Sequence, residues 1–251
     1  MSEYNPLAPC PSGGWCARCG MFHSLPASPV VDDCRALMAH FQETGLIDGL
    51  EAGLPFHLQC GVDPLFAEMG GKMFGVLACR NAAGQRVLLR AFSGQYNGLW
   101  KVPGWVGPIF DEARFQELVD EPERQIKALG KALESLAPNS PRYRLVKGQR
   151  RQLSRQLMNA IHDLYQLTNF RGVSAPLVEV FLGKGMPPAG TGDCCGPKLL
   201  HHAACNGLRP EAMAEFYWGR TNNSGTKQHG QWYPACASTC QPILGFQLCG
   251  L

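Results

Sequence analysis

The chain has 251 residues, of which 45% are hydrophobic, and a formal net charge of +3. This length and apolar content allow a substantial core, which excludes disorder throughout, and the mild basicity alone indicates no nucleic-acid partner. No stretch approaches the run of about 20 apolar residues that spans a bilayer, and residues 1–6 lack the positive and apolar regions of a secretory signal. We therefore expect a cytoplasmic protein without a membrane segment.

The first 29 residues are rich in Pro, Gly, Ser and Cys and show no periodicity, which indicates an irregular segment. They include Cys10, Cys16, Cys19 and His23 in a Cys-x5-Cys-x2-Cys-x3-His array. Zinc binds cysteine and histidine, and a structural zinc ion would explain how a segment with so little apolar core folds. We expect residues 1–29 to form a small metal-binding segment; buried thiols and an iron–sulfur cluster are the less favoured alternatives.

Residues 30–251 are expected to form a single mixed α/β (α+β) domain, which begins with a helix capped by Asp32 or Asp33. Residues 73–79 and 87–92 give the clearest strand signals, and the turn-forming residues between them predict a β-hairpin. Residues 100–108 contain two prolines, which lack the backbone donor of a strand, so we expect an aromatic loop packed on the hairpin.

A helical hairpin is predicted as an insertion at about residues 111–170. Residues 121–136 and 143–167 match amphipathic helices, and the prolines at 138 and 141 separate them. The rest of the chain alternates strand and helix, which predicts a mixed α/β layer. Its expected elements are a strand at 177–182, a helix at 194–206, a strand at 212–218 and a helix near 237–248.

The sequence contains twelve cysteines, which in a cytoplasmic protein are expected to be reduced and either buried or bound to metal. Four stand singly in apolar surroundings, where a free cysteine behaves as a small hydrophobic residue. We assign these four to burial: Cys34, Cys60, Cys79 and Cys249.

The cysteines of the C-terminal third predict a metal site. Cys236 and Cys240 are four residues apart, so on a helix their thiolates share a face. Cys194 and Cys195 open another predicted helix, where the helix dipole favours a thiolate and Asp193 can cap. We expect one cysteine of this pair to bind zinc with Cys236 and Cys240; buried core thiols are the equally weighted alternative. The fourth ligand stays open among water and three nearby histidines, His201, His202 and His229.

This layout is similar to that of the zinc nucleobase deaminases, in which a ligand-x-Glu helix start pairs with a Pro-Cys-x-x-Cys helix start. Two departures matter. Gly196 stands where the catalytic glutamate is expected, and the second motif is Cys-x3-Cys with Ala235 after Pro234. Hydrolytic deamination is therefore the alternative hypothesis, with Asp193 or Glu215 as the candidate catalytic residue.

A basic arm is predicted within the helical hairpin, because residues 142–155 contain no acid. Such an arm can follow a phosphate backbone, which makes it the candidate RNA contact; a solvated helix face is the alternative. The six basic residues are Arg142, Arg144, Lys147, Arg150, Arg151 and Arg155.

Seven short blocks of sequence occur in a recognisable order, at 71–77, 91–94, 108–111, 190–194, 197–200, 213–219 and 233–236. They include Gly-Thr-Gly-Asp-Cys at 190–194 and Tyr-Pro-Ala-Cys at 233–236. From about Phe56 to the C-terminus, the chain resembles the long N-terminal region of some bacterial RluA-type pseudouridine synthases. The resemblance favours Cys194 over Cys195 as the zinc ligand, because the block at 190–194 ends on Cys194.

In that family the region precedes a synthase module, which isomerises uridine in tRNA or rRNA with the aspartate of a His-Arg-Leu-Asp segment. This sequence lacks the segment, so the resemblance implies an RNA-modification context without the activity. The sequence therefore predicts a zinc-stabilised accessory or RNA-binding protein whose partners are RNA and a separate pseudouridine synthase. The ligands of its main zinc site are Cys194, Cys236 and Cys240, and no catalytic activity is assigned.

Overall fold

The computed structural model describes residues 9–50, 58–67 and 69–251, which fold into helices and antiparallel strands. The α+β class predicted from the sequence is confirmed. The strands are β1 (Ser12–Cys16), β2 (Met21–Leu25), β3 (Lys72–Arg80), β4 (Arg86–Phe92), β5 (Gln166–Thr168), β6 (Ser174–Pro176) and β7 (Arg209–Trp218). The α-helices are α1 (Val31–Thr44), α2 (Asp63–Phe66), α3 (Glu112–Glu134), α4 (Pro141–Asp163), α5 (Leu177–Val180), α6 (Cys195–Cys205) and α7 (Gln241–Gln247), and Ser28–Val30 and Leu58–Cys60 form 3-10 turns.

Two predictions fall on residues outside these ranges: the missing secretory signal at residues 1–6 and the start of the family resemblance at Phe56. Within the ranges, none of the helices has the length and apolarity needed to cross a membrane.

The central sheet has the order β4-β3-β7, with both pairs antiparallel. Strands β3 and β4 form the predicted hairpin, and Phe74 of β3 lies opposite Phe92 of β4 and Phe216 of β7. Since β7 joins the hairpin directly, the expected C-terminal layer and the hairpin layer are one sheet.

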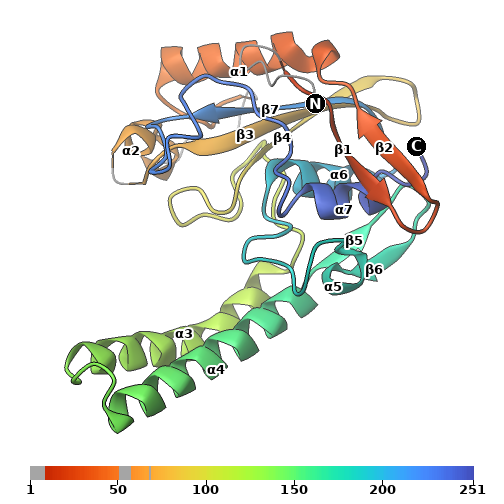
Figure 1. The fold of residues 1–251 in the computed structure, drawn as a ribbon. Helices are drawn as coiled ribbons and strands as arrows, with labels where there is room; N and C mark the ends of the chain where they lie inside the picture. Colours follow the sequence, from red (N-terminus) through yellow and green to blue (C-terminus); the bar gives the residue numbers. More distant parts are fainter. Residues whose placement is uncertain (1–8, 51–57, 68) are drawn as a thin grey trace.

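Helices cover both faces of this sheet (Figure 1). Helix α1 packs on one face over an aromatic core that includes Phe41, Phe74, Trp105 and Phe216. Helices α6 and α7 cover the opposite face, to which Leu77 and other alternate residues of the strands contribute. Because a strand points successive side chains to opposite faces, each strand serves both layers.

Four predictions need correction. Within the segment that was expected to be irregular, residues 12–25 form the antiparallel β1–β2 hairpin. Residues 177–182 were expected to form a strand, but Leu177–Val180 is one helical turn that buries both of these residues. Residues 237–240 form a turn and the helix begins only at Gln241, with Pro242 in its first turn. Neither Asp32 nor Asp33 caps α1; both lie inside its first turn, where Asp33 forms an ion pair with Arg86.

The predicted helical hairpin consists of α3 and α4, which pack against each other and extend away from the sheet and its covering helices (Figure 1). Helix α3 begins earlier than expected because Asp111 caps it, accepting a hydrogen bond from the Arg114 amide. Helix α4 ends at Asp163 because the residues that follow pair in β5. Each of the two helices therefore packs against the other along one face and exposes its opposite face to solvent.

Candidate metal centres

Three cysteine sulfurs meet at the N-terminal end of α6. Cys194 is the N-cap residue of α6, and Cys236 and Cys240 flank the turn before α7. The three sulfurs lie within 4.8 Å of one another, and those of Cys236 and Cys240 are 3.3 Å apart. The amide of Cys240 donates to the carbonyl of Cys236 at 3.2 Å, so one helical turn aligns the two side chains. This group of thiols could hold a metal ion.

The three thiols affect one another's pKa through hydrogen bonds. Hydrogen bonding with the thiols of Cys194 and Cys240 lowers the pKa of Cys236 well below its usual value. The same interaction raises the pKa of Cys194 to about 12, and it also raises that of Cys240. Cysteine binds a metal as the thiolate, so binding of a metal ion by this group would release protons.

Cys195 lies outside this group. Its thiol donates to the carbonyl of Met73 at 3.3 Å, and its Cβ packs where Gly75 of β3 leaves room. The side chain is fully buried in the core beneath α6. Of the two neighbouring cysteines, the structure thus brings only Cys194 to the other sulfurs.

Glu215 reaches the start of α6 from strand β7. Its Oε1 accepts a hydrogen bond of 3.0 Å from the Gly196 amide, so Glu215 satisfies one of the free amides at this helix end. Burial raises the pKa of Glu215 to about 7, against the lowering effect of the Gly196 amide. Lys227, whose importance the sequence did not reveal, is a nearby cation that interacts electrostatically with Glu215 and Cys236.

Asp193 does not cap α6 as expected. Its Oδ1 accepts a hydrogen bond of 2.6 Å from the hydroxyl of Tyr165, and burial raises the pKa of the carboxyl group. The side chain of Lys198 is the nearby positive charge. Asp193 therefore fastens the loop before α6 to the residues that follow the helical hairpin.

The three histidines considered as a fourth ligand are not part of the group. His201 accepts a hydrogen bond from the Thr168 amide at 3.3 Å, and His229 accepts one from the Gly219 amide at 3.2 Å. Among the described residues, the group contains neither a histidine, His202 included, nor a carboxylate. A metal ion there would have three cysteine ligands and one open position.

A second group contains Cys16, Cys19, His23 and Cys249, whose ligand atoms also lie within 4.8 Å of one another. Three of these residues belong to the predicted N-terminal array, and Cys249 takes the place expected for Cys10. Cys249 is buried, as expected for a lone cysteine in apolar surroundings, but its sulfur joins the group. The other lone cysteines, Cys34, Cys60 and Cys79, are buried as predicted.

The six residues of the predicted basic arm all lie on α4 and are exposed. Four of them, together with Ser154 and Met158, line a surface hollow of about 440 Å³. These four are Lys147, Arg150, Arg151 and Arg155.

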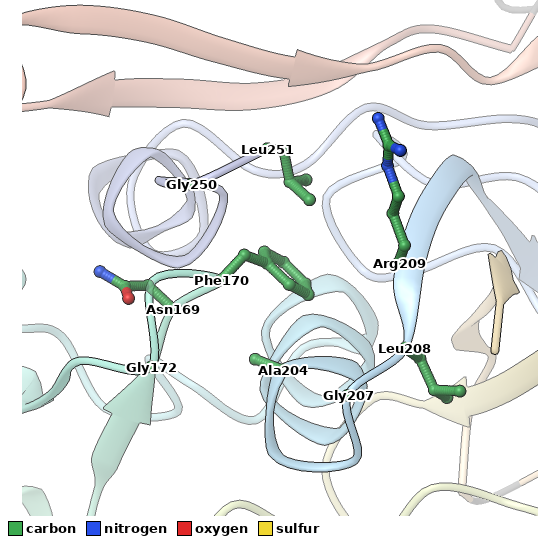
Figure 2. A pocket seen from close by; sticks show the side chains of 9 residues that line it. All are labelled: Asn169, Phe170, Gly172, Ala204, Gly207, Leu208, Arg209, Gly250 and Leu251. Carbon is green, nitrogen blue, oxygen red and sulfur yellow. The ribbon is translucent and has the colours of Figure 1, made fainter. Parts of the chain in front are cut away.

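Another hollow, of about 290 Å³, lies where β5, the end of α6 and the C-terminus come together. Figure 2 shows its lining, in which the Phe170 ring and the Arg209 side chain stand among several glycines. The residues predicted from the sequence as site residues do not line it.

No protein-family model matches the chain, and no match is found among curated proteins or solved structures. The resemblance to the N-terminal region of RluA-type synthases therefore stays a prediction.

Proposed function

We propose that this protein is a zinc-stabilised accessory or RNA-binding protein that acts in tRNA or rRNA modification together with a separate pseudouridine synthase. The observation that carries the proposal is the continuous stripe of cations along α4. Lys147, Arg151 and Arg155 are spaced four residues apart, and Arg150 lies beside them on the same hollow. On a helix this spacing keeps the charges on one face, so they can contact successive phosphates.

The charged groups of this stripe are available to bind an external anion. Within the described ranges, none of the six basic residues of α4 forms an ion pair. Two of the four basic residues of α3 are used differently, because Arg124 pairs with Glu121 and Lys127 pairs with Glu123 on the same helix. The positive charges along α4 therefore lack the neighbouring acidic partners that Arg124 and Lys127 have on α3.

Zinc suits the group at Cys194, Cys236 and Cys240 because thiolates are soft ligands and tetrahedral zinc accepts three of them with water in the fourth position. An ion there would join the start of α6 to the turn before α7. It would thereby stabilise the layer that covers the lower face of the sheet in Figure 1. The preferred role of this ion is structural.

RNA binding tests the proposal. A fluorescently labelled tRNA is titrated with the full chain at several salt concentrations, and the double variant Arg150→Ala/Arg151→Ala is compared with the wild type. We expect weaker binding to every sequence and a salt slope reduced by about 1.4–1.8, since each lost phosphate contact contributes about 0.7 in a single strand and about 0.9 in a duplex. The matched control is Arg124→Ala/Lys127→Ala on α3, which removes the same charge and should retain the affinity. Equal affinity for both double variants would contradict the proposal.

The accessory role has its own measurement. Pseudouridine formation by a stand-alone RluA-type synthase is followed with and without the chain, and the rate is expected to rise only with a protein whose α4 stripe is intact. A rate that is insensitive to the chain at saturating concentration would remove the accessory role and leave RNA binding alone.

We propose a zinc-dependent nucleobase deaminase as the second candidate, because the carboxylate of Glu215 lies beside Gly196, where the deaminase pattern has its glutamate. A zinc ion held by three thiolates would supply an activated water at its open position. Glu215 would take a proton from that water and deliver it to the leaving amine. The base would thus exchange its amino group for oxygen and release ammonia.

Ammonia release separates this candidate from the first. The zinc-loaded chain is incubated with cytidine, adenosine and single-stranded RNA, and Glu215→Gln serves as the inactive control. Deamination by the wild type alone would support the enzyme; no ammonia from any of the three substrates would exclude it for these classes.

A further inference from the structure

Four ligand atoms of the kinds that zinc prefers converge at the edge of the molecule, away from the Cys194 group. They are the sulfurs of Cys16, Cys19 and Cys249 and a ring nitrogen of His23, all within 4.8 Å of one another. The Cys19 sulfur lies 3.0 Å from His23 Nε2. Cys16 and Cys249 are almost fully buried, whereas Cys19 and His23 are partly exposed, so the group is open on one side only.

The β1–β2 hairpin positions three of these ligands. Cys16 ends β1, and the turn that follows brings Cys19 back toward it, closed by a 2.9 Å hydrogen bond from the Gly20 amide to the Cys16 carbonyl. Gly20 has a φ of +67°, which a residue with a side chain seldom adopts. His23 lies opposite Gly14 in the ladder, so its side chain lies on the face of the hairpin against which α7 packs.

The fourth ligand comes from the other end of the chain, and close packing of β1 on α7 brings it into place. A Cβ at Gly14 would lie 2.3 Å from the Gln241 carbonyl oxygen, and one at Gly245 would lie 2.1 Å from that of Trp15. The two backbones are therefore in direct contact. Cys249 follows α7 by two residues, so this contact fixes its distance from the hairpin.

Two arginines support the arrangement from outside. Arg171 Nε donates to the Cys249 sulfur at 3.3 Å, a contact that orients the side chain of this ligand. The Arg18 guanidinium lies 5.0 Å from the centre of the Phe246 ring, which holds the hairpin turn against α7. A metal site of this kind has supporting contacts as well as ligands.

We propose that Cys16, Cys19, His23 and Cys249 form a tetrahedral structural zinc site that fastens the N-terminal hairpin to the C-terminal end of α7. Three thiolates and one imidazole complete the coordination, so this ion needs no water ligand. The site is separate from the Cys194 group, which lies at the opposite end of the same helix. Residues 1–29 therefore do not form an independent metal-binding segment, since their site is complete only with a C-terminal cysteine.

Zinc content of the purified full chain tests this assignment. We expect two zinc ions per chain in the wild type, one in Cys249→Ser and two in the matched control Cys10→Ser. Cys236→Ser should also retain one ion, and the double variant Cys236→Ser/Cys249→Ser none. The assignment does not depend on RNA binding, because its ligands lie outside α4.

His23→Ala provides a second route if Cys249→Ser does not fold, since His23 is partly exposed and its loss leaves no buried cavity. This variant should also retain one zinc ion. Cobalt substitution adds a spectroscopic signature: the wild type should show thiolate charge-transfer bands from two sites, and His23→Ala from one. Two zinc ions in both Cys249→Ser and His23→Ala would overturn the proposal, as would the loss of an ion in Cys10→Ser.

Discussion

Glu215 and Gly196 are in direct contact across two elements of the fold. Glu215 Oε1 accepts a hydrogen bond of 3.0 Å from the Gly196 amide, and a Cβ added at residue 196 would lie 3.0 Å from the same oxygen. Strand β7 thus supplies the cap of α6 that the sequence assigned to Asp193. A side chain at position 196 would crowd Glu215, so this contact depends on the glycine.

Gly196→Ala is expected to lower the free energy of unfolding by about 1 kcal/mol. Crowding against Glu215 and Met213 costs about 1–3 kcal/mol, whereas alanine in a helix recovers up to about 1 kcal/mol. Urea unfolding measures the difference. Gly148→Ala in α4 is the control, because nothing lies within 4 Å of its added Cβ, and it should gain up to about 1 kcal/mol. Equal gains in both variants would show that Glu215 moves aside freely.

Cys236→Ser tests the stabilising role of the first metal group. The variant is expected to lose one zinc ion, and at free zinc about 1,000 times the dissociation constant this removes about 4 kcal/mol of stability. Thermal unfolding at fixed zinc concentration measures the loss. Cys205→Ser is the control, since Cys205 is exposed and belongs to neither group. The same midpoint for Cys236→Ser and the wild type would show that the thiols pack without metal.

The sequence revealed the parts of the fold that depend on short-range pattern. Residues 73–79 and 87–92 are apolar runs on either side of turn-forming residues, and the hairpin predicted from them is observed. The helix predicted at residues 194–206 is observed as α6. Leu177–Val180 was misassigned because a short apolar run is compatible with either a strand or a buried helical turn. Tertiary packing decides between the strand and the helical turn, and the local sequence pattern does not reveal that packing.

The second metal group shows where spacing along the chain stops being informative. Cys10 has the right residue type, but it precedes β1, whose last residue is Cys16. An extended strand rises about 3.3 Å per residue, so β1 separates Cys10 from Cys16. Cys249 had no nearby cysteine or histidine to mark it as a ligand. Its place was set by the contact between Gly14 and α7, which involves two ends of the chain.

Gly245→Ala should separate the N-terminal hairpin from α7. The added Cβ would lie 2.1 Å from the Trp15 carbonyl oxygen, and backbone on both sides cannot yield as a flexible side chain does. We expect a loss of about 3 kcal/mol and faster protease cleavage between residues 16 and 21, followed by mass spectrometry. Gly130→Ala is the control, because its nearest neighbour is the Arg150 side chain at 3.7 Å, an ordinary contact. Unchanged cleavage in Gly245→Ala would mean that the hairpin is held chiefly elsewhere.

Lys198→Met should remove a pH dependence of stability. The Lys198 side chain is buried and donates to the carbonyls of Phe92 and Gly94, each at 2.9 Å. Burial lowers its pKa from 10.5 to about 8. Between these values the unfolded chain binds a proton that the folded chain has released, so the unfolding free energy should rise with pH, by about 3 kcal/mol in total.

The measurement is urea unfolding between pH 7 and pH 11 for the wild type, Lys198→Met and the exposed control Lys131→Met. The wild type should gain about 3 kcal/mol relative to Lys198→Met over this range, because Lys198→Met lacks the ammonium group whose burial costs free energy below pH 8. Lys131→Met also lacks one lysine but keeps the buried one, so it should gain as the wild type does. A constant difference between the wild type and Lys198→Met would show that the two carbonyls compensate fully for the lost hydration.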